Sequence, residues 1–303
     1  MAAAGKMKRV RRVLSQAAKM DEQCRCLRVM SWNLLAHEFT GYEAENHGNK
    51  EAGQRFPKEH TDQCSQRCER ARRIILDKNA AVVLLQEVSY SFLNASSHGG
   101  SLPPSHSLDE LYRRYRVVTA FGDSGGGAWE PGTAVLIRKD ISVVDQFVVP
   151  GSVAQTGGTS KSACGVCVQL RDVRAWAISI HTTWGGNAEA AQRRLNHLQL
   201  LHDAMATRLS PGDAVVVGGD FNCSDSDPQL SAIEASGCLA GLKRVTLPGH
   251  TFTSGDGKSC CIDHFFLSAA LCRRLLAADV QPLVGAGQPC APCPPAVHRT
   301  PKP

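Results

Sequence analysis

The chain has 303 residues, of which 43% are hydrophobic, and this suits one large globular domain with a substantial core. No apolar run approaches the roughly 20 residues that a membrane-spanning helix needs, so no membrane partner is expected. The formal charge of +6 comes from residues 1–20, which contain six basic residues and no acid, and the remaining chain is nearly neutral. That balance argues against a strong general nucleic-acid binder, whose affinity comes from neutralising phosphates, and leaves a local basic patch open.

The two ends of the chain differ from its middle in amino-acid composition. Residues 1–24 predict either a basic arm or an organellar transit peptide, because they combine bases with small apolar residues and lack acids up to Asp21. The proline-rich residues 284–303 predict an irregular tail, which leaves 25–283 as the folded domain. Thirteen cysteines without a secretory apolar segment favour reduced thiols. We therefore expect an intracellular protein, in the cytoplasm or in an organelle.

The first half of the domain shows a strand, helix, strand pattern. A predicted strand over residues 29–31 ends in Trp32-Asn33. Thr61 can cap a helix that runs to residue 79, where apolar residues and cysteines recur at helical spacing. Residues 81–85 then form an apolar run typical of a strand buried on both faces, and it ends in Gln86-Glu87-Val88.

The second half repeats this pattern. We predict strands over 115–120, 133–138, 141–149, 163–170, 176–180, 215–218 and 262–267, and one long helix over 188–209. The strand before the helix ends in His181, and the strand after it ends in Gly219-Asp220-Phe221-Asn222. Two such α/β halves predict two mixed β-sheets packed face to face with helices outside. Polar groups at the ends of buried strands indicate a ligand site at that edge.

Five short motifs follow one another in a family's order: Trp32-Asn33, Gln86-Glu87-Val88, Ser179-Ile180-His181, Gly219-Asp220-Phe221-Asn222 and Ile262-Asp263-His264. Over residues 28–268 the chain thereby resembles the endonuclease/exonuclease/phosphatase superfamily. The resemblance implies a four-layer DNase I-like α/β sandwich. Segments 31–36, 85–88 and 132–135 are most similar to the deadenylase-like branch, which includes poly(A) nucleases and nocturnin.

The resemblance implies a metal-dependent hydrolysis of phosphate esters, with Mg²⁺ as the expected cofactor and Mn²⁺ as the alternative. Glu87 and Asn33 would hold the metal, and magnesium indeed prefers one or two carboxylates plus waters. Asp220 would orient or deprotonate the attacking water, while Asn222 would hold that water or the phosphate. His181 would donate a hydrogen bond to a phosphate oxygen, where charge needs stabilising.

The last motif departs from the family pattern. Asp263 matches the acid that holds a catalytic histidine, and His298 is the candidate for that histidine. However, Val297 stands where the family has an acid, and only five residues follow His298. A catalytic His298 and a tail residue without a role therefore both stay open. His264 lies next to Asp263 on a predicted strand and so faces the opposite side, which predicts a structural role.

The substrate is predicted from the loop after His181. Its sequence His181-Thr182-Thr183-Trp184 resembles a loop that helps hold a nucleotide in the deadenylase-like branch, so Trp184 either stacks on a base or packs as a loop aromatic. Lys161 either meets a phosphate or is a solvated surface lysine. We expect a monomeric, deadenylase-like 3′ exoribonuclease acting on RNA or another nucleotide substrate. The alternatives are a small-nucleotide phosphatase and an impaired relative that only binds a nucleic acid or protein.

Overall fold

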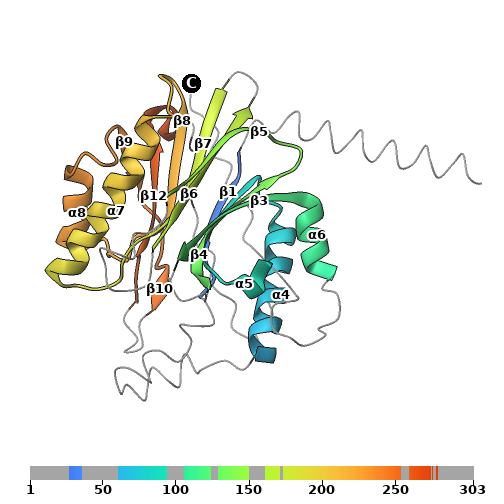
Figure 1. The fold of residues 1–303 in the computed structure, drawn as a ribbon. Helices are drawn as coiled ribbons and strands as arrows, with labels where there is room; N and C mark the ends of the chain where they lie inside the picture. Colours follow the sequence, from blue (N-terminus) through green and yellow to red (C-terminus); the bar gives the residue numbers. More distant parts are fainter. Residues whose placement is uncertain are drawn as a thin grey trace, which may run out of the picture.

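The structure is a computed structural model, and it describes residues 27–35, 61–93, 106–123, 129–149, 161–170, 173–253, 259–273, 275 and 278. The predicted arm 1–24, the tail 284–303 and the candidate His298 lie outside the described residues. Two β-sheets form the centre of the molecule, with helices on their outer faces (Figure 1).

The first sheet contains four strands in the order β1-β2-β4-β3. These are β1 (Val29–Asn33), β2 (Val82–Val88), β3 (Tyr115–Asp123) and β4 (Trp129–Arg138). The helices of this half are α4 (Thr61–Lys78), α5 (Tyr90–Leu93) and α6 (His106–Arg114). β1 and β2 are parallel because α4 forms the crossover between them, and the other pairs are antiparallel.

The second sheet contains six strands in the order β5-β6-β7-β8-β12-β9. These are β5 (Ser142–Val149), β6 (Ala163–Leu170), β7 (Val173–His181), β8 (Ala214–Asp220), β9 (Leu242–Val245) and β12 (Asp263–Ser268). The helices are α7 (Ala188–Ala206), α8 (Pro228–Ala235) and α9 (Ala269–Cys272), and a short ribbon pairs β10 (Phe252–Thr253) with β11 (Ser259–Cys260). The neighbouring strands β7 and β8 are parallel, and α7 is the crossover helix that connects them.

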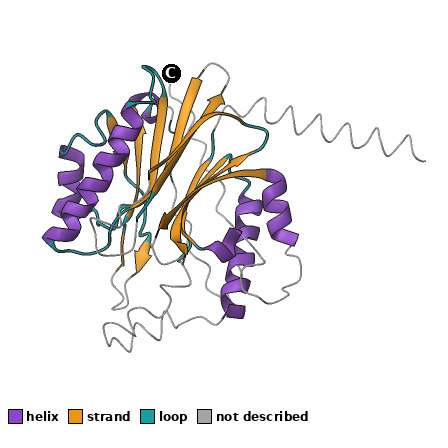
Figure 2. Cartoon of the chain, in the orientation of Figure 1, coloured by secondary structure: helices purple, strands orange, loops and turns teal. Residues whose placement is uncertain are grey.

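Apolar side chains hold these elements together in layers. Residues such as Leu84 of the first sheet and Val216 of the second share one buried cluster between the sheets. A second cluster joins α4 to the first sheet, and a third joins α7 and α8 to the second. Figure 2 shows the resulting order of helices, strands, strands and helices. The predicted four-layer α/β sandwich is confirmed.

A buried polar contact also links the sheets near one edge. The Gln86 Nε2 donates to Ser179 Oγ at 3.0 Å, and that hydroxyl donates to the Leu85 carbonyl at 2.8 Å. Gln86 and Ser179 are both fully buried. A buried polar group left without a partner costs about 1–3 kcal/mol, so these bonds favour one alignment of β2 against β7. The ends of both strands are thereby placed opposite each other.

Some elements differ from the sequence predictions. The predicted helix over 188–209 ends at Ala206, while α5, α6, α8, α9, β9, β10 and β11 were not predicted. These elements are short, and a short element shows too little periodicity to identify. Cys164 and Cys167 face opposite sides of β6, as expected for i and i+3 on a strand, and the described cysteines are all free thiols. Among the described helices, none is both long and apolar enough to cross a membrane.

Candidate active site

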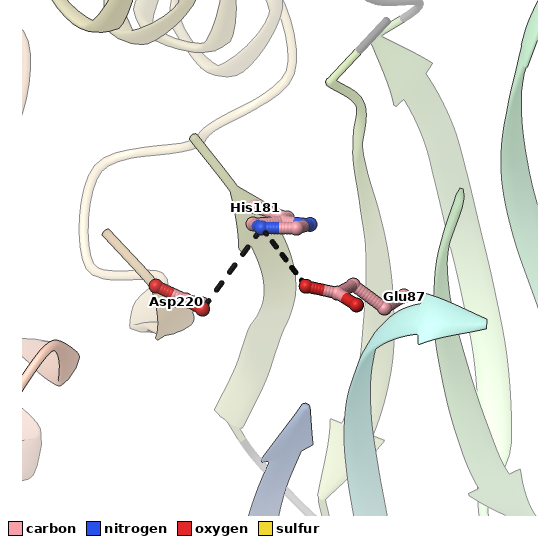
Figure 3. A group of neighbouring side chains, drawn as sticks. All are labelled: Glu87, His181 and Asp220. Atoms are coloured by element: carbon pink, nitrogen blue, oxygen red, sulfur yellow. Dashed lines mark ion pairs between the residues drawn. The ribbon is translucent and has the colours of Figure 1, made fainter. Parts of the chain in front are cut away.

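Four polar side chains from four strand ends meet at one edge of the sandwich. Asn33 ends β1, Glu87 lies near the end of β2, His181 ends β7 and Asp220 ends β8. In the parallel pairs, Asn33 lies opposite Gln86, and His181 lies opposite Asp220. Figure 3 shows the side chains of Glu87, His181 and Asp220 pointing toward one another.

The distances are those of a compact ligand set. The Asn33 amide Nδ2 lies 2.9 Å from Glu87 Oε1 and 2.9 Å from Asp220 Oδ2, so it donates to both carboxylates. His181 Nε2 lies 3.7 Å from that Glu87 oxygen and 3.9 Å from that Asp220 oxygen. One ligand atom from each of Glu87, His181 and Asp220 lies within 4.8 Å of the other two, close enough to hold one metal ion.

The backbone at these strand ends is unusual. Leu35, Glu87 and Asn222 adopt the left-handed region with φ of 54°, 52° and 51°. A non-glycine residue there costs roughly 1–2 kcal/mol. The pairing of β2 with β4 is irregular between Leu85 and Val88, which turns the Glu87 side chain out of the strand pattern. Such strained positions cluster at functional sites, and these three flank the polar group.

Negative charge accumulates in a buried position. Burial, the Asp263 charge and the Glu87 charge raise the pKa of Asp220 well above its usual value, although the Asn33 hydrogen bond opposes this. Burial and the Glu87 charge likewise raise the pKa of Asp263 to about 6. Like charges held together in this way are relieved by a cation. The carboxylates therefore fit a bound divalent metal, which would lower both pKa values.

The side chain of Lys161 contacts the polar group of the site at His181. The Lys161 ammonium lies 3.0 Å from Nε2 and 3.3 Å from Nδ1 of the His181 ring. Burial and the positive charge of Lys161 hold the pKa of His181 well below its usual value, with His197 adding to the effect. His181 is consequently neutral at pH 7 and can present one N–H and one lone pair. Lys161 is half-buried at the site, so the solvated-lysine alternative does not describe it.

Asn222 joins Asp220 to the neighbouring loop. Its backbone N–H donates to Asp220 Oδ1 at 2.8 Å, and its side-chain Nδ2 donates to the Thr182 carbonyl at 2.8 Å. The Thr182 N–H in turn donates to the Asp220 carbonyl at 2.9 Å. The side-chain amide of Asn222 thus holds the loop after His181, which leaves its carbonyl oxygen as the group that a water or phosphate could meet.

Asp263 and His264 have different surroundings. Asp263 pairs with Asp220 across β12 and β8, and its Oδ1 is buried without a hydrogen-bond partner among the described residues. Its predicted partner His298 lies outside those residues. His264 is buried, with Nε2 2.8 Å from the Cys223 carbonyl, and its ring packs edge-on against Phe221. This contact agrees with the structural role predicted for His264.

Two aromatic rings, the exposed Trp184 and the half-buried Phe252, lie beside the site. Trp184 is 58% exposed, and its ring centroid lies 6.1 Å from that of Phe252 at an interplanar angle of 57°. Phe252 begins β10, next to Thr251, whose hydroxyl accepts from the N–H of Asp263 at 3.1 Å. Phe252 was not predicted from the sequence, since a single aromatic residue in a loop region carries no recognisable pattern.

A sandwich of two mixed sheets whose strand ends gather two carboxylates, an amide and a neutral imidazole fits the class of metal-dependent phosphoester hydrolases. The chain belongs to the Endonuclease/Exonuclease/phosphatase family, whose model matches residues 30–284. Enzymes of this family act on phosphoesters and typically depend on a divalent metal.

Several solved structures share the fold. ANGEL2, a 2′,3′-cyclic phosphatase, is 16% identical with a TM-score of 0.58, and the match covers 80% of this chain and 83% of that one. TDP2 from Caenorhabditis elegans is 18% identical with a TM-score of 0.52 and the same coverages. Beta toxin from Staphylococcus aureus is 14% identical with a TM-score of 0.56, covering 80% and 86%. None of the curated protein sequences compared with this chain matches it.

Proposed function

We propose that the protein is a magnesium-dependent phosphodiesterase that cleaves a nucleotide-containing substrate, with an RNA 3′ end as the preferred one. The observation that carries the proposal is the meeting of Glu87, His181 and Asp220 within 4.8 Å of one another. The carboxylate oxygens of Glu87 and Asp220 suit Mg²⁺, and Mn²⁺ is the alternative ion. When bound, the metal supplies Lewis-acid stabilisation of charge on the phosphoryl oxygens.

The side chains of the site have separate tasks in hydrolysis. Asn33 holds one oxygen of Glu87 and one of Asp220 with a single amide, so it fixes the geometry of both carboxylates. Asp220 accepts the proton of the attacking water, because its carboxylate lies within the ligand group and a carboxylate can act as a general base there. The neutral His181 donates its N–H to a phosphate oxygen, and the adjacent Lys161 ammonium neutralises charge there.

Asp263 completes the proposed site with a histidine. A buried carboxylate oxygen without a partner is costly, and an imidazole N–H would satisfy Asp263 Oδ1. We assign that imidazole to His298, which the carboxylate would then orient toward the phosphate. The proposal accounts for an otherwise unexplained buried oxygen beside Asp220.

The substrate class is supported by the aromatic pair. Trp184 and Phe252 present ring surface at the rim of the site, and base–aromatic stacking is worth roughly 1–3 kcal/mol per base. One ANGEL2 structure contains adenosine-2′,3′-vanadate, and one TDP2 structure from D. rerio contains a single-strand DNA product. Both proteins of this fold therefore hold a nucleotide compound, which supports a nucleotide-containing substrate for this chain.

A hydrolysis panel tests the proposal. The purified protein with Mg²⁺ or Mn²⁺ should hydrolyse at least one of poly(A), mixed RNA, DNA and dinucleotides, with poly(A) or RNA cleaved fastest from the 3′ end. Asp220→Asn is the matched control, because it keeps the shape and removes the base. A steep loss of binding with added salt indicates a polymer, while near-indifference favours the small-nucleotide phosphatase. Complete inactivity of the wild-type protein with either ion would contradict the hydrolase proposal and favour the alternative of an impaired relative that only binds.

A further inference from the structure

A fully buried arginine lies next to the loop that carries Trp184. Arg194 is on α7, and its side chain is completely inaccessible to solvent. Its Nη1 donates to the Thr183 carbonyl at 2.6 Å, and its Nη2 donates to the Gly185 carbonyl at 2.8 Å and to the Gln229 side chain. Among the described residues, no carboxylate lies within ion-pairing distance of this guanidinium.

Burying a charge that only neutral groups satisfy is expensive, because carbonyl dipoles replace water incompletely. Burial accordingly lowers the pKa of Arg194. One N–H group of the guanidinium, at Nε, also has no hydrogen-bond partner among the described residues. A hydrophobic residue would fill the same space at less cost, so the two carbonyl contacts are what the arginine specifically contributes.

Hydrogen bonds from neighbouring side chains hold most of the backbone carbonyls of the loop over residues 182–186. The carbonyl of Thr182 accepts from Asn222, those of Thr183 and Gly185 accept from Arg194, and that of Gly186 accepts from the Gln229 amide at 3.5 Å. Trp184 lies in the middle of this segment with its own side chain exposed. An exposed aromatic residue is thus carried on a backbone whose carbonyls are bonded on both sides of it.

We propose that Arg194 is a positioning residue for substrate binding: its guanidinium fixes the 182–186 loop so that Trp184 stands beside Phe252 before a nucleobase arrives. A preformed stacking surface avoids the entropy cost of ordering the loop on binding. Since Asn222 bonds to the same loop, the arrangement also places the base at a set distance from Asp220. The proposal rests on the proposed nucleotide substrate.

The kinetic test uses two substrates and a matched control. Arg194→Lys and Arg194→Gln are compared with Arg193→Gln, which changes the neighbouring arginine on α7 that pairs with Glu189. The substrates are a dinucleotide and the same phosphodiester without the base that would stack. For the Arg194 variants the KM for the dinucleotide should rise about tenfold at nearly constant kcat, while the KM for the substrate without the base should not change.

A fluorescence test is independent of catalysis. The Trp184 signal is the difference between each protein and the same protein carrying Trp184→Phe, and acrylamide quenching reports the mobility and access of that ring. Quenching should increase in the Arg194 variants and stay unchanged in Arg193→Gln. Gln229→Met, which removes one acceptor of the guanidinium, provides a milder second variant if the Arg194 variants do not fold, and should increase quenching to a smaller degree.

Equal losses on both substrates, or unchanged Trp184 quenching in the Arg194 and Gln229 variants, would overturn the positioning role. Failure of the proposed function looks different, because the wild-type protein would then hydrolyse neither substrate. The quenching comparison would still decide whether Arg194 holds the loop.

Discussion

Replacing Asp263 with asparagine should stabilise the metal-free protein at neutral pH while lowering its hydrolytic activity. Burial and the Glu87 charge raise the pKa of Asp263 from 3.8 to about 6. A shift of that size corresponds to about 3 kcal/mol of unfavourable free energy when the carboxylate is ionised in the fold. Asparagine has nearly the same shape and carries no charge, so the variant avoids this penalty.

The pH dependence follows from the sign of the shift. The folded protein binds the Asp263 proton more tightly than the unfolded chain does, so wild-type stability falls as pH rises from about 4 to about 6 and the loss is complete above that. Asp263→Asn should therefore match the wild type near pH 3.5 and exceed it by about 3 kcal/mol at pH 7.5. Asp203→Asn, an exposed acid of α7, should show no such difference.

Urea unfolding in the presence of EDTA across this pH range measures the effect directly. Addition of Mg²⁺ should narrow the gap, because a bound cation stabilises the wild-type carboxylates and leaves asparagine nearly unaffected. If Asp263→Asn is equally or less stable than the wild type at pH 7.5 without metal, a partner such as the proposed His298 already compensates the Asp263 charge, and the reasoning from its raised pKa is wrong.

Three further predictions concern single side chains of the site and its surroundings. Glu87→Gln should reduce hydrolysis by about a hundredfold or more and abolish the rise in Tm that Mg²⁺ produces, measured by calorimetry with and without the ion. Trp184→Ala should raise the KM for a dinucleotide about tenfold with little change in Tm, and an unchanged KM would show that no base stacks there. His197→Gln should remove a loss of stability at low pH. Burial, with the Lys161 charge, lowers the pKa of His197 from 6.5 to about 4. The free energy of unfolding of the wild type should therefore fall by about 3 kcal/mol as pH falls from 7 to 4. An equal acid loss in the variant would exclude His197 as the cause.

The sequence predicted the strand ends well because chemistry and periodicity coincide there. A run such as 81–85 is apolar on both faces, and the polar residues that follow it, Gln86 and Glu87, mark where the strand reaches the edge. The same holds for β8 and Asp220. Parallel pairing of β1 with β2 brings Asn33 to the edge where Glu87 lies, and parallel pairing of β7 with β8 brings His181 beside Asp220. The placement of Asn33 and His181 therefore follows from topology.

Residues that lie behind the strand-end group were harder to predict. Arg194 and His197 occupy positions on the apolar side of α7, between Ala191 and Leu201 at helical spacing, and both are buried. Their position among the apolar residues of the helix is the signal that could have identified this charged and this titratable residue. Lys161 could not be placed, because the ammonium reaches His181 by a long side chain whose direction the sequence does not specify.

Each sheet is built from one continuous stretch of sequence: β1 to β4 lie within residues 29–138, and the six strands of the other sheet lie within 142–268. Glu87 comes from the first stretch, whereas Asp220 and His181 come from the second. Metal affinity should consequently emerge only after the two halves dock during folding. A divalent ion could then serve as a kinetic marker of that late step, and separately expressed halves cut near residue 140 would acquire the ion only on reassociating.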